Sequence, residues 1–276
     1  MDLNSVAEVV RPRRREGLIG WQDGDAWLAG GTWLFSEPQP AVHRLIDLES
    51  LDWPPLEVSD AGLTIAATCR IAGLHALTPP ADWIAAPLIG QCCNALLMSF
   101  KIWNLATVGG NICMSLPASA MTSLATALHG ICIIWDQHGG ERRVPIDEFV
   151  TGNHENVLEP GELLRAVEIP AAALRARTAF RQISLATIGR SAALLIGTVS
   201  PLDGAFDLTV TAATIRPLRL RFPAVPSDAE LRTRIGGTIP DDLYLDDVHG
   251  SPPYRKHMTE IFAEEIRREL AEGATR

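Results

Sequence analysis

Two glycine doublets, each preceded by apolar residues, are the features of this sequence that most directly suggest a bound ligand. One lies in the segment 28–32 (LAGGT) and the other in the segment 107–111 (TVGGN). Because glycine has no Cβ atom, neighbouring backbone N–H groups can converge on a diphosphate without steric hindrance. Two such loops facing each other across a cleft would hold an extended dinucleotide, and the adjacent threonine and asparagine would add neutral hydrogen bonds.

Glycine doublets also occur where no ligand is expected. Gly139-Gly140 and the letters GGT at 236–238 are both interpreted as turns, and the second has no apolar strand before it. The doublet alone therefore leaves a turn and a phosphate-binding loop equally open. The arginines at 11 and 13–15 are interpreted as a solvated turn and helix start rather than as a nucleotide site.

Other chemistry-bearing patterns are missing from the sequence. It has no G-x-x-x-x-G-K-[ST], no G-x-G-x-x-G and no H-E-x-x-H, and its seven histidines are scattered. None of the five cysteines lies in a C-x-x-C spacing, so we interpret them as small buried apolar residues in a reducing compartment. The cysteines are Cys69, Cys92, Cys93, Cys113 and Cys132. The residues predict no metal site and no catalytic acid or base.

Composition narrows the class of protein further. The chain has 276 residues with 47% hydrophobic residues, which is typical of globular domains with their own cores. A net charge of -9 argues against a surface that binds nucleic acid. No apolar run approaches the roughly 20 residues that a membrane helix needs. The N-terminus has no secretion pattern, so we expect a soluble cytoplasmic protein without a membrane span.

Apolar runs and breaks divide the chain into three units, at residues 1–56, 57–172 and 173–276. In the first unit, the runs at 26–29 and 45–48 predict two strands. The first glycine doublet therefore lies directly after a strand, where its backbone can face a ligand.

The second and third units contain longer predicted elements. In the second unit these are a strand at 63–67, helices at 84–100 and 118–128, and a strand at 131–135. In the third unit they are strands around Phe180 and at 208–215, a helix between them at 191–197, and a final helix that starts at 251–253. The final helix carries an apolar face, which indicates that it packs on a core. This face is formed by Met258, Ile261, Phe262, Ile266 and Leu270.

Two phrases of the sequence, in this order, resemble those of one protein family. The segment 29–32 is similar to A-G-G-[TH]-[DS]-L, and the segment 101–118 to Q-I-R-N-x-A-T-I-G-G-N-x…A-S-P-A-x-D. Both phrases are found in the FAD-binding medium subunits of molybdenum hydroxylases, of the xanthine dehydrogenase and carbon monoxide dehydrogenase type. Further similar segments lie in the same order at 45–48, 63–67, 158–170 and 250–255. The resemblance covers nearly the whole chain.

The resemblance implies an α+β fold. A PCMH or vanillyl-alcohol-oxidase-type FAD-binding domain, made of two α/β subdomains, would precede a small α+β C-terminal domain. FAD would lie between the subdomains, with its diphosphate on the two glycine loops. The cofactor-binding positions so implied are Trp27, Leu28, Ala29, Gly30, Gly31, Thr32, Trp33, Leu34, Leu97, Thr107, Val108, Gly109, Gly110, Asn111, Ala120, Leu164 and Arg181.

Three of these positions differ from the family pattern. Ala120 stands where the family usually has an acidic residue, Arg181 where it has lysine, and Trp33 where it has a small polar residue. Arginine keeps the charge of lysine but not the compact geometry of an ammonium group. The missing carboxylate at position 120 would weaken FAD binding by on the order of 1 kcal/mol.

In function, the resemblance implies an FAD-carrying electron-transfer subunit. A large partner subunit with a molybdopterin-type cofactor would hydroxylate a substrate, and a small partner with [2Fe–2S] clusters would pass the electrons to the FAD of this chain. From there the electrons would leave to an external acceptor. The expected assembly is a dimer of heterotrimers, a heterohexamer. No catalytic residue is assigned, because the flavin itself carries the redox chemistry.

Two alternatives remain open. The chain would act alone, as a flavin reductase or oxidase on the same fold, if its C-terminal domain supplied catalytic residues for a substrate. It would instead be a flavin-poor structural subunit if it had kept the fold and lost the cofactor, a possibility that Ala120 and Trp33 favour. The colour of the purified protein distinguishes the structural subunit from the others.

Overall fold

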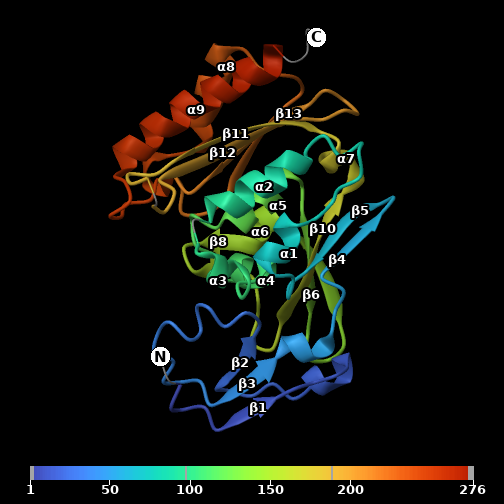
Figure 1. Ribbon diagram of the computed structural model, residues 1–276. Helices are drawn as coiled ribbons and strands as arrows, with labels where there is room; N and C mark the ends of the chain where they lie inside the picture. Colours follow the sequence, from blue (N-terminus) through green and yellow to red (C-terminus); the bar gives the residue numbers. More distant parts are fainter. Residues whose placement is uncertain (1–2, 97, 188, 273–276) are drawn as a thin grey trace.

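The computed structural model describes residues 3–96, 98–187 and 189–272. Three larger sheets follow one another along the length of the molecule, from the N-terminal part at the bottom of Figure 1 to the C-terminal helices at the top, and β8 (Val150–Gly152) and β9 (Glu155–Asn156) form a further two-stranded sheet. The three larger sheets occupy residues 8–47, 56–170 and 177–222. The division of the chain into three units at 56/57 and 172/173 stays a prediction.

The first sheet positions the first glycine doublet. It is parallel, with β3 (Arg44–Asp47) between β1 (Glu8–Val10) and β2 (Asp25–Leu28). The short 3-10 helices η1 (Arg15–Leu18) and η2 (Leu48–Leu51) help to cover its small core. Ligands of parallel sheets bind beyond the carboxyl ends of the strands, and the doublet follows that end of β2.

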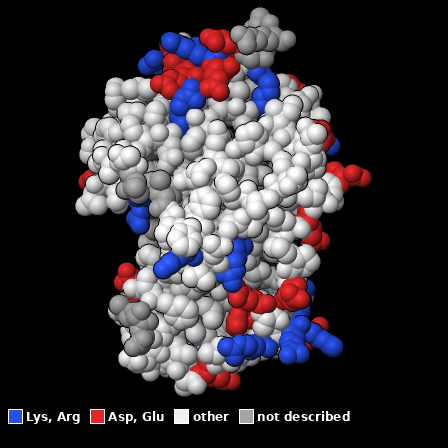
Figure 2. Space-filling view, viewed as in Figure 1, with Lys and Arg blue, Asp and Glu red and all other residues white. Residues whose placement is uncertain are grey.

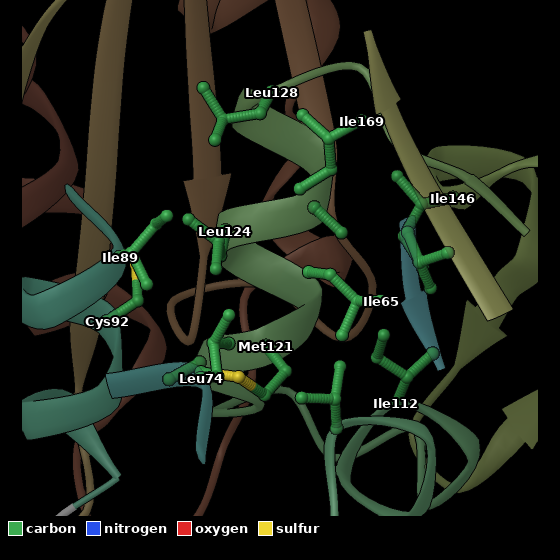
Figure 3. Close-up of a cluster of buried hydrophobic side chains, with 14 of the residues drawn as sticks. Ile65, Leu74, Ile89, Cys92, Ile112, Met121, Leu124, Leu128, Ile146 and Ile169 are labelled. Carbon is green, nitrogen blue, oxygen red and sulfur yellow. The ribbon is translucent and has the colours of Figure 1, made fainter. Parts of the chain in front are cut away.

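The second sheet is antiparallel, in the order β4-β5-β10-β6-β7. Its strands are β4 (Leu56–Ser59), β5 (Gly62–Ala66), β6 (Ile131–Trp135), β7 (Glu141–Pro145) and β10 (Leu163–Pro170). The associated short elements are α1 (Ile71–His75), α2 (Ala86–Ala95), α3 (Phe100–Trp103), α4 (Val108–Cys113), α5 (Ala120–Ala127), α6 (Ile146–Phe149), α7 (Ala171–Leu174), β8 (Val150–Gly152) and β9 (Glu155–Asn156). Helix α5 is buried along its whole length, and Figure 3 shows Leu124 and Met121 surrounded by side chains from the sheet and from neighbouring helices.

The third sheet is also antiparallel and consists of β11 (Arg177–Ile183), β12 (Ala193–Val199), β13 (Phe206–Thr211) and β14 (Leu218–Phe222), in that order. Helices α8 (Asp228–Thr238) and α9 (Pro252–Glu272) lie over its outer face, and the short 3-10 helix η3 (Asp241–Leu243) contacts α9. Side chains of β12 on the other face join the core of the second sheet. The C-terminal third is therefore packed directly onto the middle of the molecule.

Several predicted elements are confirmed and a few are wrong. The strands β2, β3, β5 and β6 and the helices α5 and α9 lie where the sequence predicts them. The predicted helix at 191–197 is instead strand β12, in which every residue is buried. A short apolar run covered on both faces has no alternating pattern, so periodicity does not separate it from a buried helix.

Three further expectations need correction. Gly236-Gly237 lies inside helix α8 and forms no turn, whereas Gly139-Gly140 does lie in a turn, closed by a bond from the Gly140 N–H to Asp136. The helix expected at 84–100 is shorter and ends at Ala95. Ile261 is 37% exposed and does not join the core-facing side of α9.

A fully buried arginine joins α9 to the third sheet. Arg255 is 0% exposed. Its Nη1 atom donates to the carbonyls of Ala192 and Ala212, both at 2.6 Å, and its Nε atom donates to the Gly250 carbonyl at 2.9 Å. Its Nη2 atom pairs with the Asp247 carboxylate. The guanidinium therefore satisfies backbone groups of three segments that are far apart in the sequence.

Charged side chains are unevenly distributed on the face seen in Figure 2. They gather over the C-terminal helices and around the first sheet, while the middle of this face is mostly uncharged. Within the described ranges, no helix combines the length and the apolar character needed to cross a membrane.

Candidate functional site

Strand β2 delivers the first loop, which we define as residues 29–34. The strand is fixed by an ion pair in which Arg44 Nε donates to Asp25 Oδ1 at 2.7 Å, and this guanidinium holds the pKa of Asp25 below its ordinary value. After the strand, Gly31 takes a φ of 67°, which favours glycine. The chain then turns back so that the Phe35 N–H donates to the Gly31 carbonyl at 2.9 Å.

Backbone N–H groups of the first loop remain available for a ligand. From Gly30 to Leu34, none of them donates to another group in the described part of the chain. They lie in consecutive residues of a tight turn. Consecutive free backbone N–H groups in a turn are suited to bind an anion.

The first and second loops are in direct contact. We define the second loop as residues 105–111. A Cβ atom added to Gly30 would lie 2.0 Å from the Leu105 carbonyl oxygen, so only glycine allows the two backbones to approach this closely. Arg70 in turn holds the start of the second loop, since its Nη1 atom donates to the carbonyls of Asn104 at 2.6 Å and Leu105 at 3.2 Å. The two glycine segments thus face each other, as the sequence predicts.

The second loop uses its own N–H groups inside the protein. The Val108 N–H donates to the Cys69 carbonyl at 2.8 Å, and the Gly109 N–H donates to the Ala67 carbonyl at 3.0 Å. The Gly110 N–H donates to Thr107 Oγ1 at 3.0 Å. We expected open N–H groups at both loops, and the structure has them only at the first. Gly109 is required for packing, because an added Cβ would lie 2.4 Å from Ala67 Cβ.

A cleft of about 460 Å³ lies between the two loops. Its wall contains all of residues 27–34 and, from the second loop, Ala106, Thr107, Gly110 and Asn111. None of the lining residues is charged. The one thiol among them belongs to Cys113, and burial raises its pKa to about 12, so it stays neutral at physiological pH. A wider groove of about 650 Å³ between β14 and α8 contains none of the predicted site residues.

This cleft fits the FAD that the resemblance implies. The N–H groups of the first loop suit a diphosphate. The Asn111 Oδ1 atom accepts from Ser119 and Met121, while its side-chain nitrogen has no partner among the described residues and can donate to a ligand. Gly110 leaves room for the ligand, since a Cβ there would meet nothing within 4 Å except Thr107 Oγ1 at 2.9 Å. The apolar remainder of the wall suits a bound ring system.

Thr107 caps helix α4 at the edge of this cleft, and its replacement by valine should destabilise the protein. Valine removes the acceptor of the Gly110 N–H, and the loss of such a cap costs about 1 kcal/mol. Urea titration of the wild type and both variants would measure the free energy of unfolding. Thr107→Ser keeps the hydroxyl and should recover most of the loss. Equal stability of Thr107→Val and the wild type would contradict this role.

Several predicted positions lie away from the cleft. Val108 and Gly109 face the core, and Ala120 is 0% exposed at the start of α5. Leu164 is buried in β10, and Arg181 on β11 pairs with Glu265 and Glu269 of α9 at 2.7 and 2.8 Å. None of these five residues lines the cleft. Leu97 lies outside the described residues.

Other residues line or border the cleft without having been predicted. Met98, Ile102, Met114 and Leu116 form part of its apolar wall, and three of them lie in or next to the long phrase at 101–118. His154 lies beside Trp33 of the first loop, with ring centroids 5.6 Å apart. No local pattern marks His154, because its neighbour is more than a hundred residues away in the sequence.

Comparison with known proteins identifies the family. The sequence model described as "FAD binding domain in molybdopterin dehydrogenase" matches residues 5–172. Caffeine dehydrogenase subunit beta of Pseudomonas sp. (strain CBB1) is 32% identical over 165 residues, which cover 58% of this chain and 54% of that protein. The carbon monoxide dehydrogenase medium chain of Hydrogenophaga pseudoflava is 26% identical over 192 residues, 66% of this chain and 62% of the relative. The matched part thus spans between half and two thirds of these two relatives.

Solved structures confirm the expected α+β fold over the whole chain. Quinoline 2-oxidoreductase from Pseudomonas putida 86 superimposes with a TM-score of 0.80 and 20% identity, and both chains are covered completely. Carbon monoxide dehydrogenase from Oligotropha carboxidovorans gives a TM-score of 0.78 and 21% identity, over 97% of this chain and 99% of the other. With the family match over residues 5–172 and this shared fold, the chain belongs to the FAD-binding domain family of molybdopterin dehydrogenases, whose cofactor is FAD.

Proposed function

We propose that this chain is the FAD-carrying electron-transfer subunit of a multi-subunit molybdenum-containing hydroxylase or dehydrogenase. It would collect electrons from the [2Fe–2S] clusters of a small partner and pass them to an external acceptor. The observation that carries the proposal is the uncharged cleft between the two loops, with unpaired N–H groups on one side and Gly110 on the other. When bound, FAD supplies a redox centre that suits both one-electron and hydride chemistry.

The residues of the chain bind and orient the cofactor. The first loop would hold the diphosphate through its backbone N–H groups, and the Thr107 hydroxyl and the Asn111 amide would add hydrogen bonds from the opposite wall. The lining side chains are apolar, amide, hydroxyl or neutral thiol groups. They are suited to exclude water around the ligand rather than to transfer protons, so catalysis at a separate substrate is assigned to a partner.

The partners follow from the relatives. Caffeine dehydrogenase subunit beta and carbon monoxide dehydrogenase medium chain are by name parts of larger enzymes, and one similar solved structure is a copper- and molybdenum-containing carbon monoxide dehydrogenase. We infer a large molybdopterin-binding partner and a small [2Fe–2S] partner, in a cytoplasmic dimer of heterotrimers. We also infer that residues 1–56 and 57–172 form the FAD-binding subdomains and 173–276 the C-terminal domain.

Flavin content tests the proposal directly. The purified chain, after addition of excess FAD and removal of unbound cofactor, should retain about one FAD per chain, measured by its visible absorption and by release on denaturation. Co-expression with the neighbouring reading frames should move the chain to a larger species in size-exclusion chromatography. A well-folded chain that remains colourless would contradict the FAD role and support the flavin-poor structural subunit. A chain that stays alone and oxidises a substrate itself would support the reductase or oxidase.

A further inference from the structure

A second cavity continues the cleft toward the C-terminal third of the chain. It has a volume of about 310 Å³ and shares Met98, Asn111 and Leu116 with the cleft. Its far wall is formed by residues 189–191, between strands β11 and β12. The first loop does not contribute to this second cavity. A dinucleotide whose diphosphate lies on the first loop would therefore extend one of its ring ends into it.

The second cavity contains one charged residue. Arg190 lines it, and the other lining residues are apolar, glycine, serine or asparagine, with no acidic group among them. The Arg190 guanidinium makes no hydrogen bond or ion pair within the described part of the chain. Arg190 also borders a small cavity that contains Asp247, but that carboxylate is already paired with the buried Arg255. The Arg190 side chain is exposed, and its charge has no carboxylate partner among the described residues, beside a cleft whose described lining is neutral.

We propose that Arg190 lies beside the isoalloxazine ring of the bound FAD and makes that ring easier to reduce. This inference rests on the proposed function, because it concerns the same cofactor. Of the two ring systems of FAD, only isoalloxazine gains electrons, and charge near its N1 atom is one way in which a protein tunes its redox behaviour. A guanidinium offers only hydrogen-bond donors, which match the acceptors of the N1–C2=O edge. Adenine stays neutral and would gain little from the charge.

The remaining wall of the second cavity is compatible with a flat ring. Ala95, Leu96, Met98, Leu116 and Ala118 supply apolar surface, and Ser191 supplies a hydroxyl next to Arg190. The ring would be bordered by apolar side chains on one side and by the guanidinium on the other.

The test is the redox midpoint potential of the bound FAD in Arg190→Gln, in Arg190→Lys and in the wild type. Glutamine keeps hydrogen-bonding ability and removes the charge. We expect the affinity for reduced FAD, relative to oxidised FAD, to fall about tenfold in Arg190→Gln, which corresponds to about 30 mV for a two-electron couple. Arg190→Lys should recover part of this shift. Arg234→Gln, at an exposed arginine on α8 that lines the distant groove, is the matched control and should leave the potential unchanged.

The outcomes separate this inference from the proposed function. If the wild type binds FAD and Arg190→Gln has the same potential as Arg234→Gln, the inference is wrong and the FAD role stands. If Arg190→Gln weakens the binding of oxidised and reduced FAD equally, the guanidinium contacts another part of the cofactor and the inference is again wrong. If the wild type binds no FAD at all, the proposed function is wrong, and the inference is wrong with it. Circular dichroism of each variant checks that the fold is kept.

Discussion

Replacement of Gly110 by glutamate should abolish FAD binding and leave the fold intact. A Cβ at this position meets only Thr107 Oγ1, at 2.9 Å, so the longer side chain would extend into the cleft that both loops line. There it would occupy the ligand's volume and bring a negative charge close to the diphosphate. Juxtaposed like charges cost several kcal/mol, so we expect the dissociation constant for FAD to rise more than about hundredfold. Titration followed by flavin fluorescence would measure it.

Two control variants separate the cleft from general effects of the substitution. Gly236→Glu introduces the same side chain at an exposed helical glycine of α8, where an added Cβ meets nothing within 4 Å, and should bind FAD like the wild type. Gly110→Ala adds only the Cβ and should weaken binding far less than glutamate does. If Gly110→Glu retained wild-type affinity, the ligand would not lie between the two loops.

Replacement of Arg255 by methionine should destabilise the protein by about 3–5 kcal/mol, as expected when the buried partner of an ion pair is removed. The guanidinium is 0% exposed and donates to the carbonyls of Ala192, Ala212 and Gly250. Methionine fills a similar volume but leaves these acceptors and the Asp247 carboxylate without their partner. The free energy of unfolding, from urea titration followed by circular dichroism, is the measurement.

The matched control is Arg268→Met on the same helix. The Arg268 side chain is 68% exposed and pairs with Glu264 one turn away, so its loss should change the free energy of unfolding by no more than about 0.5 kcal/mol. Arg255→Lys retains the charge but only part of the hydrogen-bonding capacity of the guanidinium. Its free energy of unfolding should lie between those of Arg255→Met and the wild type. Comparable effects of Arg255→Met and Arg268→Met would refute the role assigned to the buried guanidinium.

The glycine doublets alone were ambiguous, and the site became predictable only when they were combined with the resemblance of the longer phrase. Gly30 and Gly31 follow an apolar strand, and their order relative to the phrase at 101–118 indicated a shared cleft, which the structure contains. The pattern did not reveal why each glycine is needed. Gly30 and Gly109 allow close packing against Leu105 and Ala67, and only Gly110 has a free direction toward the ligand.

Other features depend on contacts that no local pattern contains. Strand β12 was predicted as a helix, because burial on both faces removes the alternation that marks a strand. The N–H groups of the second loop have acceptors on Ala67 and Cys69, some forty residues earlier, so their use inside the protein could not be inferred from the loop itself. The position of Arg190 beside the second cavity likewise depends on how the third sheet packs onto the second.

The close approach of Gly30 to the Leu105 carbonyl brings the two loops of the FAD cleft together only in the folded chain, so the free energy of unfolding depends on the concentration of FAD. The unfolded polypeptide has no such juxtaposition, so FAD would bind the native state alone and shift the equilibrium toward it by mass action. At free FAD a hundred times its dissociation constant, the gain is about 2.7 kcal/mol. In a cell short of riboflavin, the precursor of FAD, a larger fraction of the chain would be unfolded and exposed to proteolysis. The abundance of the subunit would then depend on the supply of FAD as well as on the expression of its gene.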